Sequence, residues 1–217
     1  VKDIRPGVKT EYIDKKARDL IVAKGAETSF DKVPGYKWAT CIAINEQIVH
    51  TPPSQRVIKD GDVVTVDIGV FHKGFHTDFA TTVLVGDYDE RKVKFLESGK
   101  EVLRKALSLV KTGRYIGEIS RCIEQEMSRA ELKTIVRLTG HGVGRSLHED
   151  PSIPQFLEGP IEKTYKMRPG LVIAVEVMYS ETTHNMKHEK GDDWSLITDD
   201  GSLSAQFEHT IAITEKN

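Results

Sequence analysis

The stretch VVTVDIGV at residues 63–70 decides the fold. Its run of β-branched residues predicts a strand, and the sequence HKG at residues 72–74 predicts a turn. A second predicted strand runs through residues 79–85, so the two strands form a hairpin that carries Asp67 on one arm and Asp78 on the other. An aspartate in an apolar strand needs a partner, because burial of an unpaired carboxylate is costly.

The C-terminal half of the chain repeats this feature. Residues 171–178, LVIAVEVM, predict a strand that is apolar except for Glu176, and the predicted strand at residues 206–214 carries Glu208. Each half therefore combines strands with acidic residues at similar positions. This parallel suits a pseudo-twofold fold with a site between the halves.

Helices and further strands complete an α+β pattern. Apolar residues recur at helical spacing in three predicted helices, at residues 10–24, 89–110 and 116–129. Two shorter strands are predicted at residues 38–44 and 194–197, with a polar loop at residues 181–193.

The composition is that of a soluble globular protein, with 38% hydrophobic and 29% charged residues among 217. A net charge of −2 gives no attraction to nucleic acid or to an anionic membrane. No stretch approaches the roughly 20 apolar residues of a membrane span. The first residues, VKDIRP, do not read as a signal peptide. We therefore expect a cytoplasmic protein without membrane or specific nucleic-acid partners, in which Cys41 and Cys122 are free thiols.

The four acidic strand residues and one histidine form a candidate site. His141 lies in the glycine-flanked sequence GHGVG at residues 140–144. Carboxylate oxygens with an imidazole nitrogen suit a dinuclear centre for divalent cations. Taken singly, each acid is more often a half-exposed residue or an ion-pair partner, and a basic side chain could also balance the charge.

The order and context of these residues resemble the methionine aminopeptidase family. The interval of 11 residues between Asp67 and Asp78 matches the hairpin of that family. Further stretches similar to its motifs are TGHGVGR at residues 139–145, HEDP at 148–151, VEVM at 175–178, SLSAQFEHT at 202–210, and INE at 44–46 with His50. The resemblance covers the chain from Pro6 to Thr214.

The resemblance implies a pita-bread (creatinase/aminopeptidase) fold, in which a curved antiparallel sheet with pseudo-twofold symmetry is covered by helices. It implies removal of the N-terminal methionine from proteins and peptides by a hydroxide that two divalent metal ions activate, the candidate ions being Co, Mn, Fe, Zn and Ni. Five residues would be the ligands, with the second and the last bridging the ions: Asp67, Asp78, His141, Glu176 and Glu208.

The resemblance also implies catalytic and substrate-binding roles. Glu176 would accept a proton from the attacking water. His148 would donate a hydrogen bond to the scissile carbonyl oxygen, and His50 would contact the scissile nitrogen and help to protonate the leaving amine. The methionine side chain would lie against His50, His148 and four further residues: Tyr36, Cys41, Leu147 and Trp194. For Cys41 and Trp194, simple core packing is the alternative.

The implied substrates are nascent polypeptides that start with Met, and the ribosome is a further candidate partner. We expect a monomer in which residues 1–217 form one catalytic domain, with the earlier amphipathic helix usual in the family either absent or trimmed. His141, Glu176 and Glu208 follow one another at intervals of 35 and 32 residues, which leaves no room for the insertion of type II enzymes. A compact type I enzyme is therefore the nearer match.

Two alternatives stay open. X-Pro aminopeptidases and prolidases share the five ligands, although they normally carry a large extra N-terminal domain. Some relatives with this fold are catalytically silent binding proteins, although these have usually lost metal ligands. The chain departs from the family pattern at residues 51–53, Leu147, residues 79–80 and Val177, and these departures affect the expected pocket shape and substrate range.

Overall fold

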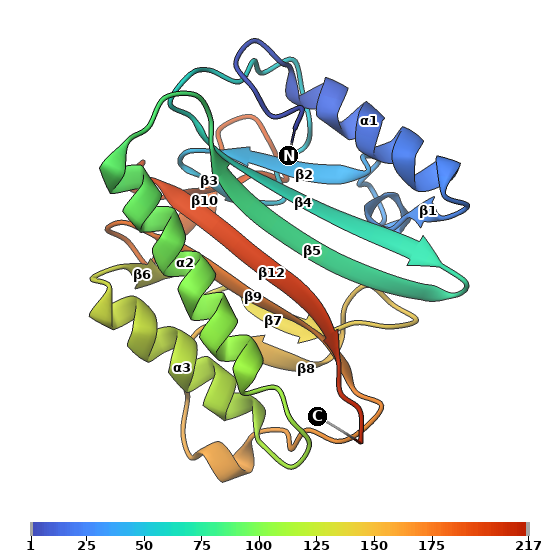
Figure 1. Ribbon diagram of the computed structural model, residues 1–217, viewed down its shortest axis with the longest axis vertical. Helices are drawn as coiled ribbons and strands as arrows, with labels where there is room; N and C mark the ends of the chain where they lie inside the picture. The colour runs from blue at the N-terminus through green and yellow to red at the C-terminus, as the bar shows by residue number, and fades with distance from the viewer. Residues whose placement is uncertain (1, 216–217) are drawn as a thin grey trace.

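The computed structural model describes residues 2–215, which form one nine-stranded sheet, one three-stranded sheet and three α-helices (Figure 1). The helices are α1 (Thr10–Ala23), α2 (Glu90–Ser108) and α3 (Ile116–Arg129). The large sheet contains β1 (Glu27–Thr28), β2 (Thr40–Ile44), β4 (Val63–His72), β5 (Phe75–Leu84), β6 (Lys133–Thr134), β7 (Thr139–Gly142), β8 (Glu149–Pro154), β9 (Val172–Ser180) and β12 (Ser204–Ala212). The small sheet contains β3 (Gln47–Val49), β10 (Met186–His188) and β11 (Leu196–Thr198).

The predicted hairpin is confirmed as β4 and β5. Lys73 and Gly74 form its turn with φ angles of 50° and 86°, the left-handed backbone that a two-residue hairpin turn with the twist of the strands requires. The second arm begins at Phe75, four residues earlier than the sequence indicated, so Asp78 lies inside the strand. Asp67 pairs with Ala80, and Gly69 pairs with Asp78.

The large sheet has the predicted pseudo-twofold arrangement. Its central strands follow the order β4-β5-β12-β9, so the hairpin of the first half lies beside the β9–β12 pair of the second half. The halves join where Phe79 and Ala80 of β5 pair with His209 and Glu208 of β12. The inner strands β5 and β12 carry Asp78 and Glu208. The next strands outward, β4 and β9, carry Asp67 and Glu176.

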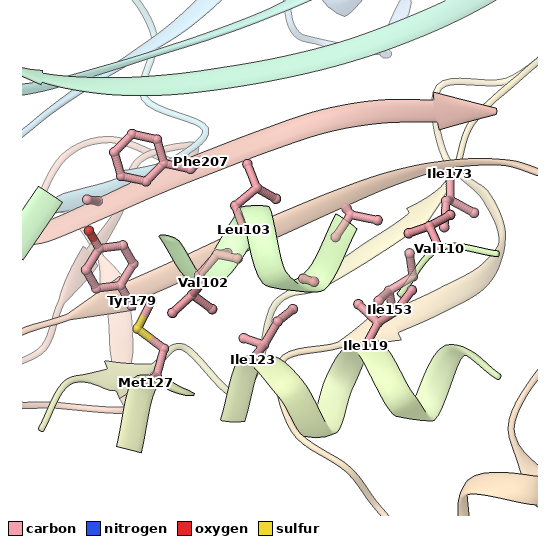
Figure 2. Close-up of a cluster of buried hydrophobic side chains, with 14 of the residues drawn as sticks. Val102, Leu103, Val110, Ile119, Ile123, Met127, Ile153, Ile173, Tyr179 and Phe207 are labelled. Atoms are coloured by element: carbon pink, nitrogen blue, oxygen red, sulfur yellow. The ribbon is translucent and has the colours of Figure 1, made fainter. Parts of the chain in front are cut away.

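Side-chain alternation gives the sheet one face for helices and one for the site. On β9, Val175 and Val177 pack into the core beneath α2 and α3, whereas Glu176 points to the opposite face. Figure 2 shows this core, in which Ile123 and Met127 of α3 point toward strand and α2 side chains. The helices therefore stabilise the strands from behind and leave the other face open for polar chemistry.

The first half is built in the same way around α1. Ile13 of α1 packs with Ile42 and Val64, while Thr65 and Asp67 alternate onto the opposite face of β4. In Figure 1, α1 lies over the first half of the sheet, and α2 with α3 lies over the second. This division agrees with the predicted α+β architecture.

Two details, at residues 181–193 and at residues 38–44, differ from the sequence prediction. The expected polar loop at residues 181–193 contains β10, which pairs with β11 in the small sheet. His141 lies in the short strand β7, where the flanking glycines allow close approach of the neighbouring backbone: a Cβ at Gly140 would lie 2.7 Å from the Ala174 carbonyl oxygen. The strand expected at residues 38–44 begins at Thr40. Across the part of the chain that the structure covers, no helix is long and apolar enough to cross a membrane.

We predict that Gly99→Ala destabilises the protein even though alanine favours helices by about 1 kcal/mol. A Cβ at residue 99 would lie 2.4 Å from the hydroxyl of buried Tyr179, which donates a hydrogen bond to the Phe95 carbonyl. Overpacking of this kind costs about 1–3 kcal/mol. Urea denaturation should show this loss of unfolding free energy. Lys94→Ala, at an exposed position of the same helix, should change it by less than about 0.5 kcal/mol. An equal stability of Gly99→Ala and the wild type would contradict the prediction.

Candidate functional site

One lateral row of the sheet collects three of the predicted ligands. Asp67 of β4 pairs with Ala80, Ala80 also pairs with Glu208 of β12, and Glu208 pairs with Glu176 of β9. Directly paired residues in a sheet project to the same face. The three carboxylates therefore share one face of four adjacent strands.

The two other predicted ligands lie one step along the same face. Asp78 precedes Ala80 by two residues, and His141 pairs with Ala174, which precedes Glu176 by two residues. Residues two apart on a strand project to the same side. The ligand atoms of Asp78, His141 and Glu208 lie within 4.8 Å of one another, a spacing that can hold a metal ion.

The histidine presents a lone pair to the acids. The His141 Nδ1 lies 2.8 Å from the Gly142 carbonyl oxygen, and because a carbonyl only accepts, Nδ1 carries the proton. The free Nε2 lies 3.8 Å from Asp78 Oδ2 and 3.9 Å from Glu176 Oε1. Burial lowers the pKa of His141 to about 4, so the ring is neutral and acts as a ligand rather than as a counter-charge.

Burial raises the pKa of all four acids. The pKa values of Asp67 and Glu208 lie well above the ordinary range because of burial and then because of the neighbouring carboxylates. Burial raises the pKa of Asp78 to about 7, although a hydrogen bond with Asp67 opposes the shift. Burial and the charge of Asp78 raise the pKa of Glu176, and the Gln206 amide opposes it. At this spacing the four carboxyl groups can all be ionised only if nearby positive charge offsets their mutual repulsion.

The donor set fits divalent cations. Asp67 Oδ1 and Glu208 Oε1 are buried and have no hydrogen-bond partner. Among the described residues, no lysine or arginine forms an ion pair with any of the four acids, so the alternative of a basic partner is not realised. Carboxylate oxygens and one imidazole nitrogen suit borderline and hard divalent ions, which favour the ionised form of the acids.

Sequence reasoning missed two polar residues that support the ligands from β12. Gln206 Nε2 donates to Glu176 Oε2 at 3.1 Å and to Glu208 Oε2 at 3.3 Å. The Thr210 hydroxyl donates to the Asp78 carbonyl at 2.7 Å and accepts from the Asp78 amide at 2.8 Å. Both residues lie two positions from Glu208, so the period of the strand could have indicated them.

A small apolar cavity of about 200 Å³ adjoins the acids, and we call it the residue-1 pocket. All six predicted substrate-binding residues line it: Tyr36, Cys41, His50, Leu147, His148 and Trp194. Phe30 and Val33 also line it and were missed, because they belong to the 3₁₀ helix Phe30–Lys32 and its C-cap, a segment too short to show a pattern.

Aromatic packing fixes the shape of the residue-1 pocket. The Tyr36 ring meets Trp38 and Trp194 edge-on, with both pairs of ring centroids 5.1 Å apart. The Tyr36 hydroxyl donates to the Thr40 carbonyl at 2.8 Å, and its oxygen lies 3.2 Å from Cys41 Sγ. Burial raises the pKa of the Cys41 thiol, so this residue is a neutral apolar contact and not a nucleophile. Both Cys41 and Cys122 are free, as predicted.

The two remaining histidines lie between the residue-1 pocket and a larger cleft. His50 adopts a φ of 59°, a left-handed conformation that is rare for residues other than glycine, directly after β3. His148 meets the His141 ring edge-on with ring centroids 4.5 Å apart. Burial lowers the pKa of both His50 and His148, so neutral rings line the boundary between the cavities.

Hydrogen bonds hold the loop that carries Leu147 and His148. The His76 amide donates to the Gly144 carbonyl at 2.7 Å, and the Ser146 amide donates to Glu149 Oε1 at 2.7 Å. The hairpin tip of the first half thus anchors a loop of the second half.

The larger cleft has a volume of about 720 Å³ and contains the predicted ligands Asp67, Asp78, His141, Glu176 and Glu208 in its wall. Gln206 and Met178 line the cleft but not the residue-1 pocket, whereas His50 and His148 line both.

Comparisons with known proteins agree with this geometry. A model of metallopeptidase family M24 matches residues 1–215. The chain is 39% identical over 214 residues to methionine aminopeptidase 1 of Bacillus subtilis, covering 99% of this chain and 85% of that protein. It is similar to the crystal structure of methionine aminopeptidase from Thermotoga maritima, with a TM-score of 0.94, 38% identity and coverage of 99% and 85%.

Other solved structures share the fold at lower identity. Prolidase from Pyrococcus furiosus has a TM-score of 0.75 and 22% identity, and the match covers 99% of this chain but 55% of that one. This neighbour shows the fold alone. The pita-bread architecture predicted from sequence is thereby confirmed.

We predict that divalent ions stabilise the protein through the acidic cluster. Mn²⁺ at about 100 times its dissociation constant should contribute about 2.7 kcal/mol, or roughly 5–10 °C in Tm for a chain of this size. Glu208→Gln should lose most of that gain in a thermal melt of metal-stripped protein with and without Mn²⁺, whereas Glu158→Gln, an exposed acid outside the cleft, should keep it. An equal gain in all three proteins would place the ion elsewhere.

Proposed function

Because the chain belongs to metallopeptidase family M24, we propose that it removes the N-terminal methionine from proteins and peptides as a metal-dependent aminopeptidase. The observation that carries this proposal is the contact between two features. A cluster of five candidate metal ligands lines a cleft that shares Asp67, Asp78, His50 and His148 with an apolar pocket of about 200 Å³. Such a pocket beside a hydrolytic centre suits an exopeptidase.

Asp67, Asp78, His141, Glu176 and Glu208 would hold two divalent ions. Such ions act as Lewis acids and lower the pKa of a bound water to near neutrality. Asp78 and Glu208 lie on the two inner strands where the halves of the sheet join, which favours these two residues as the shared ligands.

Glu176 is the proposed acceptor for the proton of the attacking water. Its Oε2 already accepts from the Gln206 amide, so Oε1 is the oxygen available for the proton. The pKa of this carboxyl is raised by burial, which brings its basicity nearer to that of a useful general base.

His148 and His50 are the proposed substrate-facing groups. A neutral His148 ring can donate its N–H to the carbonyl oxygen, where negative charge develops. His50 lies on the boundary between the residue-1 pocket and the cleft, where the scissile nitrogen would pass, and it would assist departure of the amine.

The residue-1 pocket suits methionine. Its volume of about 200 Å³ and its lining of aromatic, aliphatic and thiol side chains match an unbranched thioether. Leu147, where the family often has an aromatic residue, contributes to this apolar wall.

The remaining expectations follow from this activity and stay proposals. Nascent polypeptides that start with Met are the proposed substrates in the cytoplasm, with the ribosome as the docking partner. We also propose a monomer in which residues 1–217 act as one catalytic domain, since a single continuous sheet supplies all five ligands. The type I subclass agrees with the short intervals between ligands.

The first experiment measures hydrolysis of Met-Ala-Ser by metal-stripped protein, before and after addition of Co²⁺ or Mn²⁺, with Ala-Pro-Ala alongside. We expect metal-dependent release of free methionine and no cleavage of the proline peptide. Cleavage of the proline peptide alone would indicate an X-Pro enzyme. No cleavage of either peptide would indicate a binding protein.

A second experiment tests the role of His148. Loss of one hydrogen-bond donor to a developing oxyanion typically lowers kcat by about 10²–10³-fold, so His148→Ala should show such a loss with Met-Ala-Ser. His72→Ala, at the exposed hairpin tip, should keep wild-type kcat. The Mn²⁺-dependent rise in Tm should persist in both variants. A kcat for His148→Ala within threefold of the wild type would exclude the role.

A further inference from the structure

The cleft contains a cation that the proposed chemistry does not use. Arg137 is exposed, and it is the single lysine or arginine among the described residues that line the 720 Å³ cleft. Its guanidinium has no hydrogen bond or ion pair with any other described residue. Most arginines near carboxylates form such pairs, so a free guanidinium over a substrate path can bind a ligand.

The backbone of Arg137 is fixed close to the site. Arg137 lies in a turn closed by a hydrogen bond of 3.2 Å from the Leu138 amide to the Ile135 carbonyl. The Ile135 amide donates in turn to the Met178 carbonyl at 2.9 Å, which ties this turn to β9. Leu138 and Met178 pack in one apolar cluster. The arginine is thus presented from a rigid turn and not from a free loop.

The hydrogen bond between Ile135 and Met178 relates the turn that contains Arg137 to the position of Glu176 on β9. Met178 follows Glu176 by two residues on the same strand, which is roughly 7 Å at about 3.3 Å per residue. The turn that contains Arg137 is joined to Met178 by the hydrogen bond from the Ile135 amide. An extended peptide with its first bond at Glu176 would bring its third or fourth residue to Arg137.

The cleft has opposite charges at its two ends. Glu149 and Asp150 lie at the start of β8, at one end of the β7–β8 pair. Thr139 pairs with Pro154 at the other end of the pair, and Arg137 precedes Thr139 by two residues. The other titratable groups in the cleft wall are the five predicted ligands, His50 and His148. A substrate carboxylate is therefore repelled from the β8 start and attracted toward Arg137.

We propose that Arg137 is a specificity-determining residue that binds a carboxylate at the third or fourth position of the substrate. This inference rests on the proposed aminopeptidase function. The carboxylate can come from an aspartate or glutamate side chain, or from the C-terminus of a short peptide. The strength is that of a partly exposed ion pair, so the preference should be modest, about two- to fivefold in kcat/KM.

The test compares C-terminally amidated pentapeptides that differ at one position. Met-Ala-Xaa-Ala-Ala-amide and Met-Ala-Ala-Xaa-Ala-amide carry Glu, Gln or Lys at Xaa. We expect the wild type to cleave a Glu peptide two- to fivefold faster than the matching Lys peptide. Arg137→Glu should reverse that order and leave the Gln peptide within twofold. Arg121→Glu, which makes the same charge change on the exposed side of α3, should keep the wild-type order.

A second arm identifies the source of the carboxylate. Met-Ala-Ala as the free acid and as the amide are compared in the wild type and in Arg137→Glu. A preference for the acid that Arg137→Glu abolishes supports binding of the C-terminus, and a preference within the amidated pentapeptides supports binding of a side chain. The same Glu-to-Lys ratios and acid-to-amide ratios in wild type and Arg137→Glu would overturn the inference. If the wild type failed to cleave the Gln peptides, the proposed function itself would fail.

Discussion

The fold depends on the need to compensate four carboxylates that share one buried site. Asp67, Asp78, Glu176 and Glu208 are each at least nine-tenths buried, and their mutual repulsion opposes ionisation. Without a cation this arrangement costs stability, because hydrogen bonds from Gln206 and from the Phe79 amide reach only some of the buried oxygens, and Asp67 Oδ1 and Glu208 Oε1 have no partner. Bound divalent ions offset this cost, because the buried carboxylates then serve as ligands and contribute to the affinity for the ions.

The sheet provides the rigidity that this cluster needs. Each acid comes from a different strand of the central four, and each strand is fixed by its neighbours and by the helices behind it. Asp67 and Glu176, on the outer of these strands, flank Asp78 and Glu208 on the inner ones. The pseudo-twofold arrangement thus brings two weakly similar halves to one centre, and neither half alone supplies the complete set.

The junction between the two halves of the sheet also forms the pocket and the cleft of the proposed substrate site. The pocket beside Tyr36 and Trp194 comes from the first half and the small-sheet hairpin, and Leu147 and His148 come from a loop of the second half that the β4–β5 tip anchors. In the proposed function, this aromatic packing selects the first residue of a substrate. Later residues meet a cleft whose charge changes along its length, with Arg137 at one end.

The sequence by itself determined the hairpin, the helices and the acids that stand in apolar strands. These signals are local: a charged residue among β-branched neighbours, as at Asp67 and Glu176, conflicts with its surroundings and can be recognised within a few residues. Phe30 and Arg137 give no such conflict, because an aromatic residue in a three-residue 3₁₀ helix and an exposed arginine are ordinary wherever they occur. Their positions at the site are decided by strand register and by contacts between residues far apart in the chain, and only the tertiary structure fixes those.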